Sequence, residues 1–289
     1  MNGNEKASVT EHLAGIHTPL RNPRAQTRLI HFDPVESGDS ILVSLETWDS
    51  ESAPPYNAIS YTWGELSDRH AIIINNTRVH VSEHCFHALV QARLRFPSDH
   101  VWIDAICINR LNIKEESAQV ALMGKIYANA SLVLACAGPS DAFIRTAIEL
   151  YGTAIFQDTP KWGELEQGGV WKFDMHTWSF TWHPECPTDS HLFFPWDDED
   201  ENLLTRLLGE WNELSARPYF QQARIVRELS GGKHRTMILC GQDVMEWTRV
   251  VSLGWRLHRL NLHSATSQPR SYMDVKLMML NDQIHSDPM

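Results

Sequence analysis

The stretch that decides the fold is VWIDAICINRLNIKEESAQVALMGKIYANASLVLACAGP, residues 101–139. It begins with an apolar run, Val101 to Ile108, and ends with a second one, Leu132 to Ala137, and the apolar residues between them fall at helical spacing. Two apolar runs around a helical segment predict a strand, a helix and a second strand parallel to the first. Because open α/β sheets bind ligands at the carboxyl ends of their strands, we expect the functional site beside Asp104 and Asn109.

Other elements extend this unit toward the N-terminus. The sequence pattern predicts β-hairpins at 28–47 and 70–81, a strand at 56–63 and a helix at 82–96. Asn75 and Asn76 supply the turn of the second hairpin, Gly64 ends the strand, and Ser82 is the expected N-cap of the helix. The predicted fold class is α/β, with a mostly parallel central sheet flanked by helices, β-hairpin additions and an aromatic-rich insertion.

The domain organisation follows from shifts in composition along the 289 residues. We expect a flexible lead-in (1–26), a domain at 27–260 and a C-terminal tail (261–289). Within the domain, a core (56–157) precedes the aromatic-rich insertion (158–200) and a closing α/β element (203–260). The insertion holds five tryptophans: Trp162, Trp171, Trp178, Trp182 and Trp196.

Composition excludes several classes of protein. The formal net charge of −11 argues against a nucleic-acid-binding surface, which needs clustered Lys and Arg. Five cysteines without a CxxC pair indicate reduced, buried thiols. The N-terminus lacks an apolar signal region, and no apolar run reaches the length of a membrane span. We therefore expect a cytoplasmic protein.

The sequence gives little support to a metal site or to a catalytic thiol. His176, His183, Cys186 and His191 could hold a metal, but their spacings match no zinc template, so no metal is predicted. Cys107 has no sequence signature that joins it to a histidine, and a buried cysteine usually acts as a small apolar residue.

Two blocks resemble a known family. Tyr56–Gly64 (YNAISYTWG) and Val101–Asn109 (VWIDAICIN) are similar to the first and second blocks of the fungal heterokaryon incompatibility (HET) domain, and the second continues through Glu115 and Gln119. The resemblance implies an effector of programmed cell death in self/non-self recognition, a form of innate immunity. It also implies a TIR-like core and a protein partner or self-association.

The third block of that family is only partly matched. Pro218-Tyr219-Phe220 and Glu228 fit it, whereas Gln222, Arg224 and Arg227 depart from it. In the second block Arg110 replaces the usual glutamine. These departures leave open a degenerate copy without activity.

The resemblance and the strand ends together name the candidate site. The candidate ligand-binding residues are Ser60, Tyr61, Trp63, Gly64, Asp104, Asn109 and Gln119. Asp104 either caps a neighbouring loop or binds a ribose hydroxyl, since a carboxylate in an apolar run needs a partner. The candidate catalytic residues are Glu115, by its place in the block, and Glu149, by the order of elements in TIR domains. Glu115 has a structural alternative, because an acid in a first helical turn complements the helix dipole.

Two classes of function follow. Some TIR domains cleave NAD, so one hypothesis is N-glycosidic cleavage of NAD or a related nucleotide as substrate, with a glutamate that stabilises an oxocarbenium-like transition state and no cofactor. The other is a non-enzymatic module that associates with itself or with a partner protein, in which exchange of Glu115 or Glu149 for Gln leaves toxicity intact.

Overall fold

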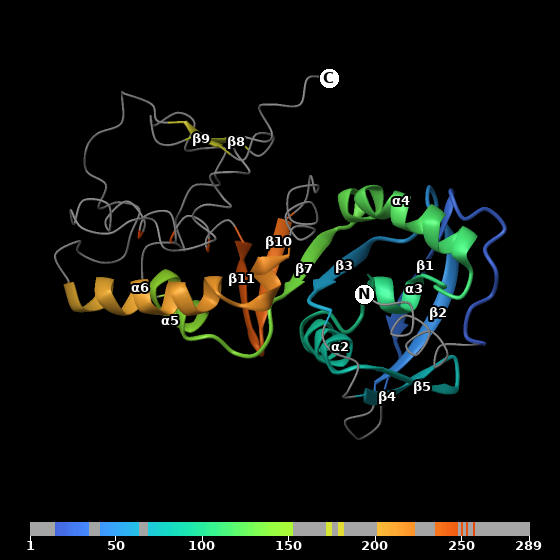
Figure 1. Ribbon diagram of the computed structural model, residues 1–289, viewed down its shortest axis with the longest axis horizontal. Coiled ribbons are helices and arrows are strands. Elements are labelled where there is room, and N and C mark those ends of the chain that lie inside the picture. The colour runs from blue at the N-terminus through green and yellow to red at the C-terminus, as the bar shows by residue number, and fades with distance from the viewer. Residues whose placement is uncertain are drawn as a thin grey trace. The chain divides into compact units, whose positions relative to one another are not determined.

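The computed structural model describes residues 15–34, 41–63, 69–152, 172–174, 179–181, 201–222 and 235–247, together with residues 250, 253 and 257 (Figure 1). The chain divides into two compact units. The first comprises residues 1–139 and 222–244, and the second comprises residues 140–221 and 245–289.

The first unit opens with two strand pairs. Its elements up to residue 95 are β1 (Gln26–Phe32), β2 (Leu42–Asp49), β3 (Tyr56–Tyr61), β4 (Arg69–Ile74), β5 (Thr77–Ser82) and α2 (Glu83–Arg95). Strands β1 and β2 pair antiparallel, as do β4 and β5, so both predicted hairpins are confirmed. Asn75 and Asn76 hold positive φ angles of 48° and 63°, which asparagine tolerates better than most residues. The Ser82 side chain accepts a hydrogen bond from the Cys85 N–H, which confirms it as the N-cap.

The deciding stretch begins differently from the prediction. Strand β6 (His100–Trp102) ends before Asp104, and Asp104–Cys107 form one helical turn, α3, in which the Cys107 N–H donates to the Ile103 carbonyl. The prediction of a strand through Ile108 is wrong. A short apolar run buried on all sides has no periodicity that separates strand from helix. Helix α4 (Ile113–Asn129) and strand β7 (Leu132–Cys136) are confirmed.

Strands β10 (Arg235–Cys240) and β11 (Asp243–Glu246) complete a nine-stranded sheet within the described part of the chain. The strand order is β11-β10-β7-β3-β6-β1-β2-β4-β5. Its centre is parallel, because β3 pairs in parallel with both β6 and β7, and β10 pairs in parallel with β7. Beyond that centre β1 runs antiparallel to β6 and to β2, and the long ladders β1–β2 and β4–β5 are antiparallel.

The sheet is therefore mixed, and the prediction of a mostly parallel sheet is wrong. The flanking helices are confirmed. Figure 1 shows α4 on one side of the central strands and α2 on the other. All six residues of β3 are buried, as expected for a strand covered on both faces. Hydroxyls from both elements tie α4 to this strand: Tyr56 donates to the Ile126 carbonyl (2.7 Å) and Tyr127 to the Ile59 carbonyl (3.1 Å).

The second unit contains two helices, α5 (Ala142–Gly152) and α6 (Glu201–Ser215). They pack through the rings of Phe143 and Trp211, whose centroids lie 5.1 Å apart. Near the 3-10 helix η4 (Pro218–Gln221), Arg217 forms an ion pair of 2.7 Å with Asp141. From the predicted insertion, the structure describes an antiparallel pair, β8 (Lys172–Asp174) and β9 (Ser179–Thr181).

Several predictions fall outside the described residues. These are the lead-in up to residue 14, most of the insertion (158–200), a possible short helix or strand at 223–229 and the tail (261–289). The predicted domain boundaries stay predictions. In the part of the chain that is described, no helix is both long and apolar enough to cross a bilayer.

Candidate functional site

The edge of the sheet where β3 and β6 end brings the two sequence blocks together. These strands are parallel, so their carboxyl ends lie at the same edge. Ser60 and Tyr61 close β3, and Asp104 is the first residue of α3, separated from the end of β6 by Ile103 alone. A five-residue loop then leads to α4, whose N-cap is Asn112, so the start of α4 faces the same region.

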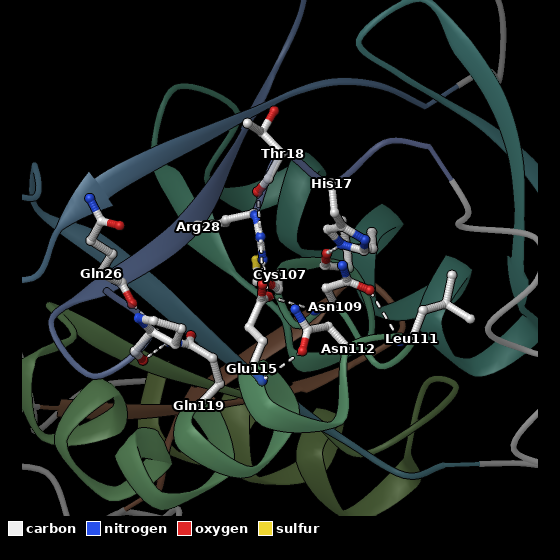
Figure 2. Close-up of polar contacts among 12 residues, drawn as sticks. His17, Thr18, Gln26, Arg28, Cys107, Asn109, Leu111, Asn112, Glu115 and Gln119 are labelled. Atoms are coloured by element: carbon white, nitrogen blue, oxygen red, sulfur yellow. Dashed lines mark hydrogen bonds and ion pairs between the residues drawn. The ribbon is translucent and has the colours of Figure 1, made fainter. Parts of the chain in front are cut away.

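A buried ion pair occupies the interior of this region (Figure 2). Arg28 of β1 contacts Glu115 of α4 with both terminal nitrogens: Nη1 lies 2.6 Å from Oε1, and Nη2 lies 3.1 Å from Oε2. Each side chain is 1% exposed. Such a bidentate pair is strong and geometrically specific, and removal of one partner leaves an uncompensated charge in the interior.

The remaining hydrogen bonds of this pair go to the backbone. Arg28 also donates to the carbonyls of Cys107 (3.0 Å) and Thr18 (2.7 Å), and Glu115 accepts from the Asn109 N–H (3.1 Å). Burial by itself raises the pKa of Glu115, but hydrogen bonds from Arg28, its charge and the backbone N–H groups of Asn109 and Leu20 outweigh burial and hold the pKa below its usual value. Glu115 is therefore an ionised, fully engaged carboxylate.

Two further side chains, Gln119 and His17, hold the N-terminal segment of residues 17–28 in place. Gln119, one helical turn after Glu115 and 0% exposed, donates from Nε2 to the carbonyls of Pro23 (2.6 Å) and Gln26 (2.7 Å). His17 Nε2 lies 2.7 Å from the Ile106 carbonyl oxygen, and burial lowers the pKa of this imidazole. Residues 17–28 are thus held against α3 and α4 by side chains at four positions.

A second, more exposed cluster surrounds Arg110 in the loop between α3 and α4. Its guanidinium carbon lies 4.1 Å from the centroid of the Trp63 ring, a cation–π contact. Nη2 lies 3.3 Å from Asp104 Oδ2, and Nη1 lies 3.6 Å from Glu116 Oε1. Asp104 is 6% exposed and Arg110 is 16% exposed, so the cluster reaches the surface at Arg110. The Arg110 guanidinium is thus held by one aromatic face and two carboxylates.

The other predicted site residues are distributed as follows. Ser60 and Tyr61 are buried in β3, where Tyr61 contacts the Cys85 thiol, and the Asn109 side chain accepts a hydrogen bond from the Leu111 N–H (3.1 Å). Glu149 is exposed on α5, in the second unit. Gly64 lies outside the described residues.

Sequence reasoning missed Arg28 and the pairing of Arg110 with Trp63. Arg28 occupies a buried position of β1, between Thr27 and Leu29. An arginine flanked by buried strand residues is a signal for a buried acidic partner, because a charge in a core must be paired. The signal does not say which of the 36 acidic residues is that partner.

Thiol and metal chemistry receive no support in the described part of the chain. Cys107 is fully buried, and burial raises the pKa of its thiol to about 12, so it stays protonated. No group of three or more His, Cys, Asp or Glu residues suited to a metal occurs in the segments that the structure describes. The possible metal ligands His176, His183, Cys186 and His191 lie outside those segments.

Comparison with known proteins finds one family likeness. Residues 56–185 match the family model described as "Heterokaryon incompatibility protein (HET)". This matched region covers less than half of the chain, so the chain is similar to the HET family over these residues. The chain is also 30% identical, over 135 residues, to "Heterokaryon incompatibility protein 6, OR allele" of Neurospora crassa. This alignment covers 42% of the present chain and 20% of that relative, so the chain matches about a fifth of the length of the fungal protein.

No solved structure matches the chain, and the TIR-like core stays a prediction. The HET match starts at residue 56, whereas Arg28 and the carbonyls bound by Gln119 precede it. Glu115 and Gln119, which lie inside the matched region, therefore bind a segment that precedes it.

Loss of the buried pair should destabilise the first unit strongly. Arg28→Met leaves the Glu115 carboxylate buried without its counter-charge, and we expect the free energy of unfolding to fall by about 3–5 kcal/mol in urea denaturation. The double variant Arg28→Met/Glu115→Leu should recover part of this loss, because no buried charge remains. Arg78→Met, on an exposed position of β5, is the control and should change stability by less than about 0.5 kcal/mol. A loss at Arg28 as small as at Arg78 would contradict the assignment.

The same pair predicts how stability depends on pH. The pKa of Glu115 is lowered in the folded state, so its contribution is present above the unfolded-state value of about 4.3 and is lost as pH falls through the folded pKa. Below about pH 4.3 the unfolding free energy of the wild type should therefore fall more steeply than that of Glu115→Gln. Denaturant midpoints measured between about pH 6 and 3 test this. Parallel curves for the two proteins would show that Glu115 has no depressed pKa.

Proposed function

We propose that this chain acts in heterokaryon incompatibility, as an effector that triggers programmed cell death when unlike fungal cells fuse. The observation that carries the proposal is the HET match over residues 56–185, supported by the similarity to the Neurospora crassa incompatibility protein. The geometry supports it further, because both blocks that define the resemblance meet at one edge of the sheet.

The place of action within the domain is the Arg110 cluster. The buried pair Arg28–Glu115 fixes the start of α4 and the backbone of Cys107 and Asn109. The loop that carries Arg110 is therefore anchored at both of its ends. Asp104 and Trp63 reach this loop from the ends of β6 and β3. Functional groups on a loop above a rigid sheet are a common arrangement for binding sites.

A second candidate function is nucleotide binding, with NAD as the substrate to test. One observation favours it: the Trp63 face and the carboxylates of Asp104 and Glu116 surround a planar cation, the Arg110 guanidinium. The oxidised nicotinamide ring is also a planar cation. If the nicotinamide ring of NAD takes the place of the Arg110 guanidinium, Asp104 is the nearer of the two carboxylates to that ring, since it lies 3.3 Å from the guanidinium and Glu116 lies 3.6 Å from it. Glu115 is engaged by Arg28, so its carboxylate is not available at this cluster. Glu149 lies in the second unit and is a catalytic candidate from the order of elements in the sequence alone.

Conditional expression in a filamentous fungus tests the incompatibility role. We expect the wild type to arrest growth and kill cells, and Trp63→Ala and Asp104→Asn to lose this effect at equal protein levels. Glu46→Gln, on an exposed position of β2, is the matched control and should stay toxic. A wild type that accumulates without harm, or site variants as toxic as the control, would speak against the role of this cluster.

Nicotinamide release from NAD tests the enzymatic candidate separately. Purified wild type should release nicotinamide, and Asp104→Asn should lower the rate by at least about 100-fold, the usual range for loss of a positioned carboxylate. The same measurement on Glu149→Gln tests the second catalytic candidate. If the wild type releases none at high protein concentration while it still kills cells, NAD cleavage is excluded. The incompatibility role then stands without it.

A further inference from the structure

The outer side of α4 and the loop residue just before its N-cap expose a cluster of large apolar side chains. Of the four large apolar side chains exposed in the described part of the chain, three lie within ten residues: Leu111 (52%), Ile113 (76%) and Val120 (50%). Ile113 and Val120 are seven residues apart and therefore share one face of the helix. The exposed residues on this face, here named the α4 outer face, are Leu111, Ile113, Lys114, Ser117, Val120, Ala121, Gly124 and Lys125.

Small residues on this face allow close approach of a partner. Ser117 and Gly124 lie between and beyond the two apolar anchors, and a Cβ placed at Gly124 would meet nothing within 4 Å. The face is thus an uncovered apolar stripe over more than three turns of α4. Clustered exposed apolar side chains of this kind mark interaction surfaces, whereas scattered ones need no explanation.

The charge of the face is opposite to that of the chain. Lys114 and Lys125 are exposed and eleven residues apart, about 16 Å along the helix, so they form a basic row beside the apolar stripe. The acidic residues of α4 do not neutralise them, since Glu115 is buried against Arg28 and Glu116 pairs with Arg110. A positively charged apolar face on a chain of net charge −11 fits an acidic, apolar partner.

The sequence of this chain contains one segment of that chemistry. Residues 192–200, Leu-Phe-Phe-Pro-Trp-Asp-Asp-Glu-Asp, join four large apolar side chains to four acidic ones. Their placement lies outside the described residues. In extended form nine residues span up to about 30 Å, enough to follow the 17-residue helix α4, which is about 25 Å long. The segment therefore supplies both the apolar side chains and the charges that the face requires.

We propose that the α4 outer face binds residues 192–200 of a second copy of the chain. The apolar side chains of that segment pack against Ile113 and Val120, and its carboxylates pair with Lys114 and Lys125. Each copy presents one face and one segment, so the contact is head-to-tail and generates rings or open chains of subunits. This self-association is independent of any ligand at the Arg110 cluster.

Sedimentation velocity on the full chain tests the proposal. The wild type should form species larger than a dimer as its concentration rises, and raised salt should weaken them. Ile113→Asp/Val120→Asp removes the face, and Asp197→Lys/Asp198→Lys removes the segment. Each should weaken self-association at least about tenfold, as expected for loss of the central anchors of an interface. Leu94→Asp, at a 58% exposed apolar position of α2, is the control and should associate like the wild type.

The mixture of the two variants is the decisive sample. One variant keeps an intact segment and the other an intact face, so an equimolar mixture should form a dimer that grows no further. Lys114→Glu/Lys125→Glu is a second face variant that leaves the apolar stripe unchanged. Because its face is acidic, it should bind the basic segment of Asp197→Lys/Asp198→Lys more tightly than it binds the acidic segment of the wild type. A wild type that stays monomeric at every concentration overturns the proposal, as does a mixture that stays monomeric or a pair of variants that associate like the wild type.

Discussion

The ion pair between Arg28 and Glu115 holds together parts of the chain that are far apart in sequence. Its partners lie 87 residues apart, on the antiparallel strand β1 and on helix α4. Through Thr18, Cys107 and Asn109 the same two side chains bind the N-terminal segment, the turn α3 and the loop before α4. Because both charges are excluded from water, each depends on the other, and the elements that carry them are constrained together.

At this edge of the sheet, buried residues around Glu115 have a structural role, whereas the cluster around Arg110 reaches the surface. Glu115 and Gln119 belong to the HET resemblance, yet their polar atoms bind Arg28 and the backbone of residues 23–26, as structural residues do. Asp104 belongs to the same block, but it faces Arg110, which reaches the surface. The second sequence block thus contains structural residues, Glu115 and Gln119, and also Asp104, the residue proposed to act in the site.

The local elements were predictable because their signals are local. The Asn75-Asn76 turn, the Ser82 cap and the helical spacing at 113–129 each lie within one element. The strand expected through Ile108 failed because a short buried run carries no period, and Asp104 to Cys107 turn into a helix there. The mixed sheet was missed because antiparallel β1 lies between β2 and β6, and strand pairing depends on partners distant in sequence. The partner of Glu115 was not predicted for the same reason, because Arg28 is distant in sequence. Asp104 and Trp63, which both contact Arg110, were expected at one edge because the parallel strands β3 and β6 end there.

Amide hydrogen exchange of the native protein tests the coupling most directly. If the buried pair joins the N-terminal segment to helix α4, the amides of Leu20 and Asn109, which face Glu115, should exchange with the same opening free energy as the central amides of α4. In Glu115→Gln that shared protection should separate, with Leu20 exchanging faster than α4. Rapid exchange of Leu20 in the wild type, while α4 stays protected, would contradict the account.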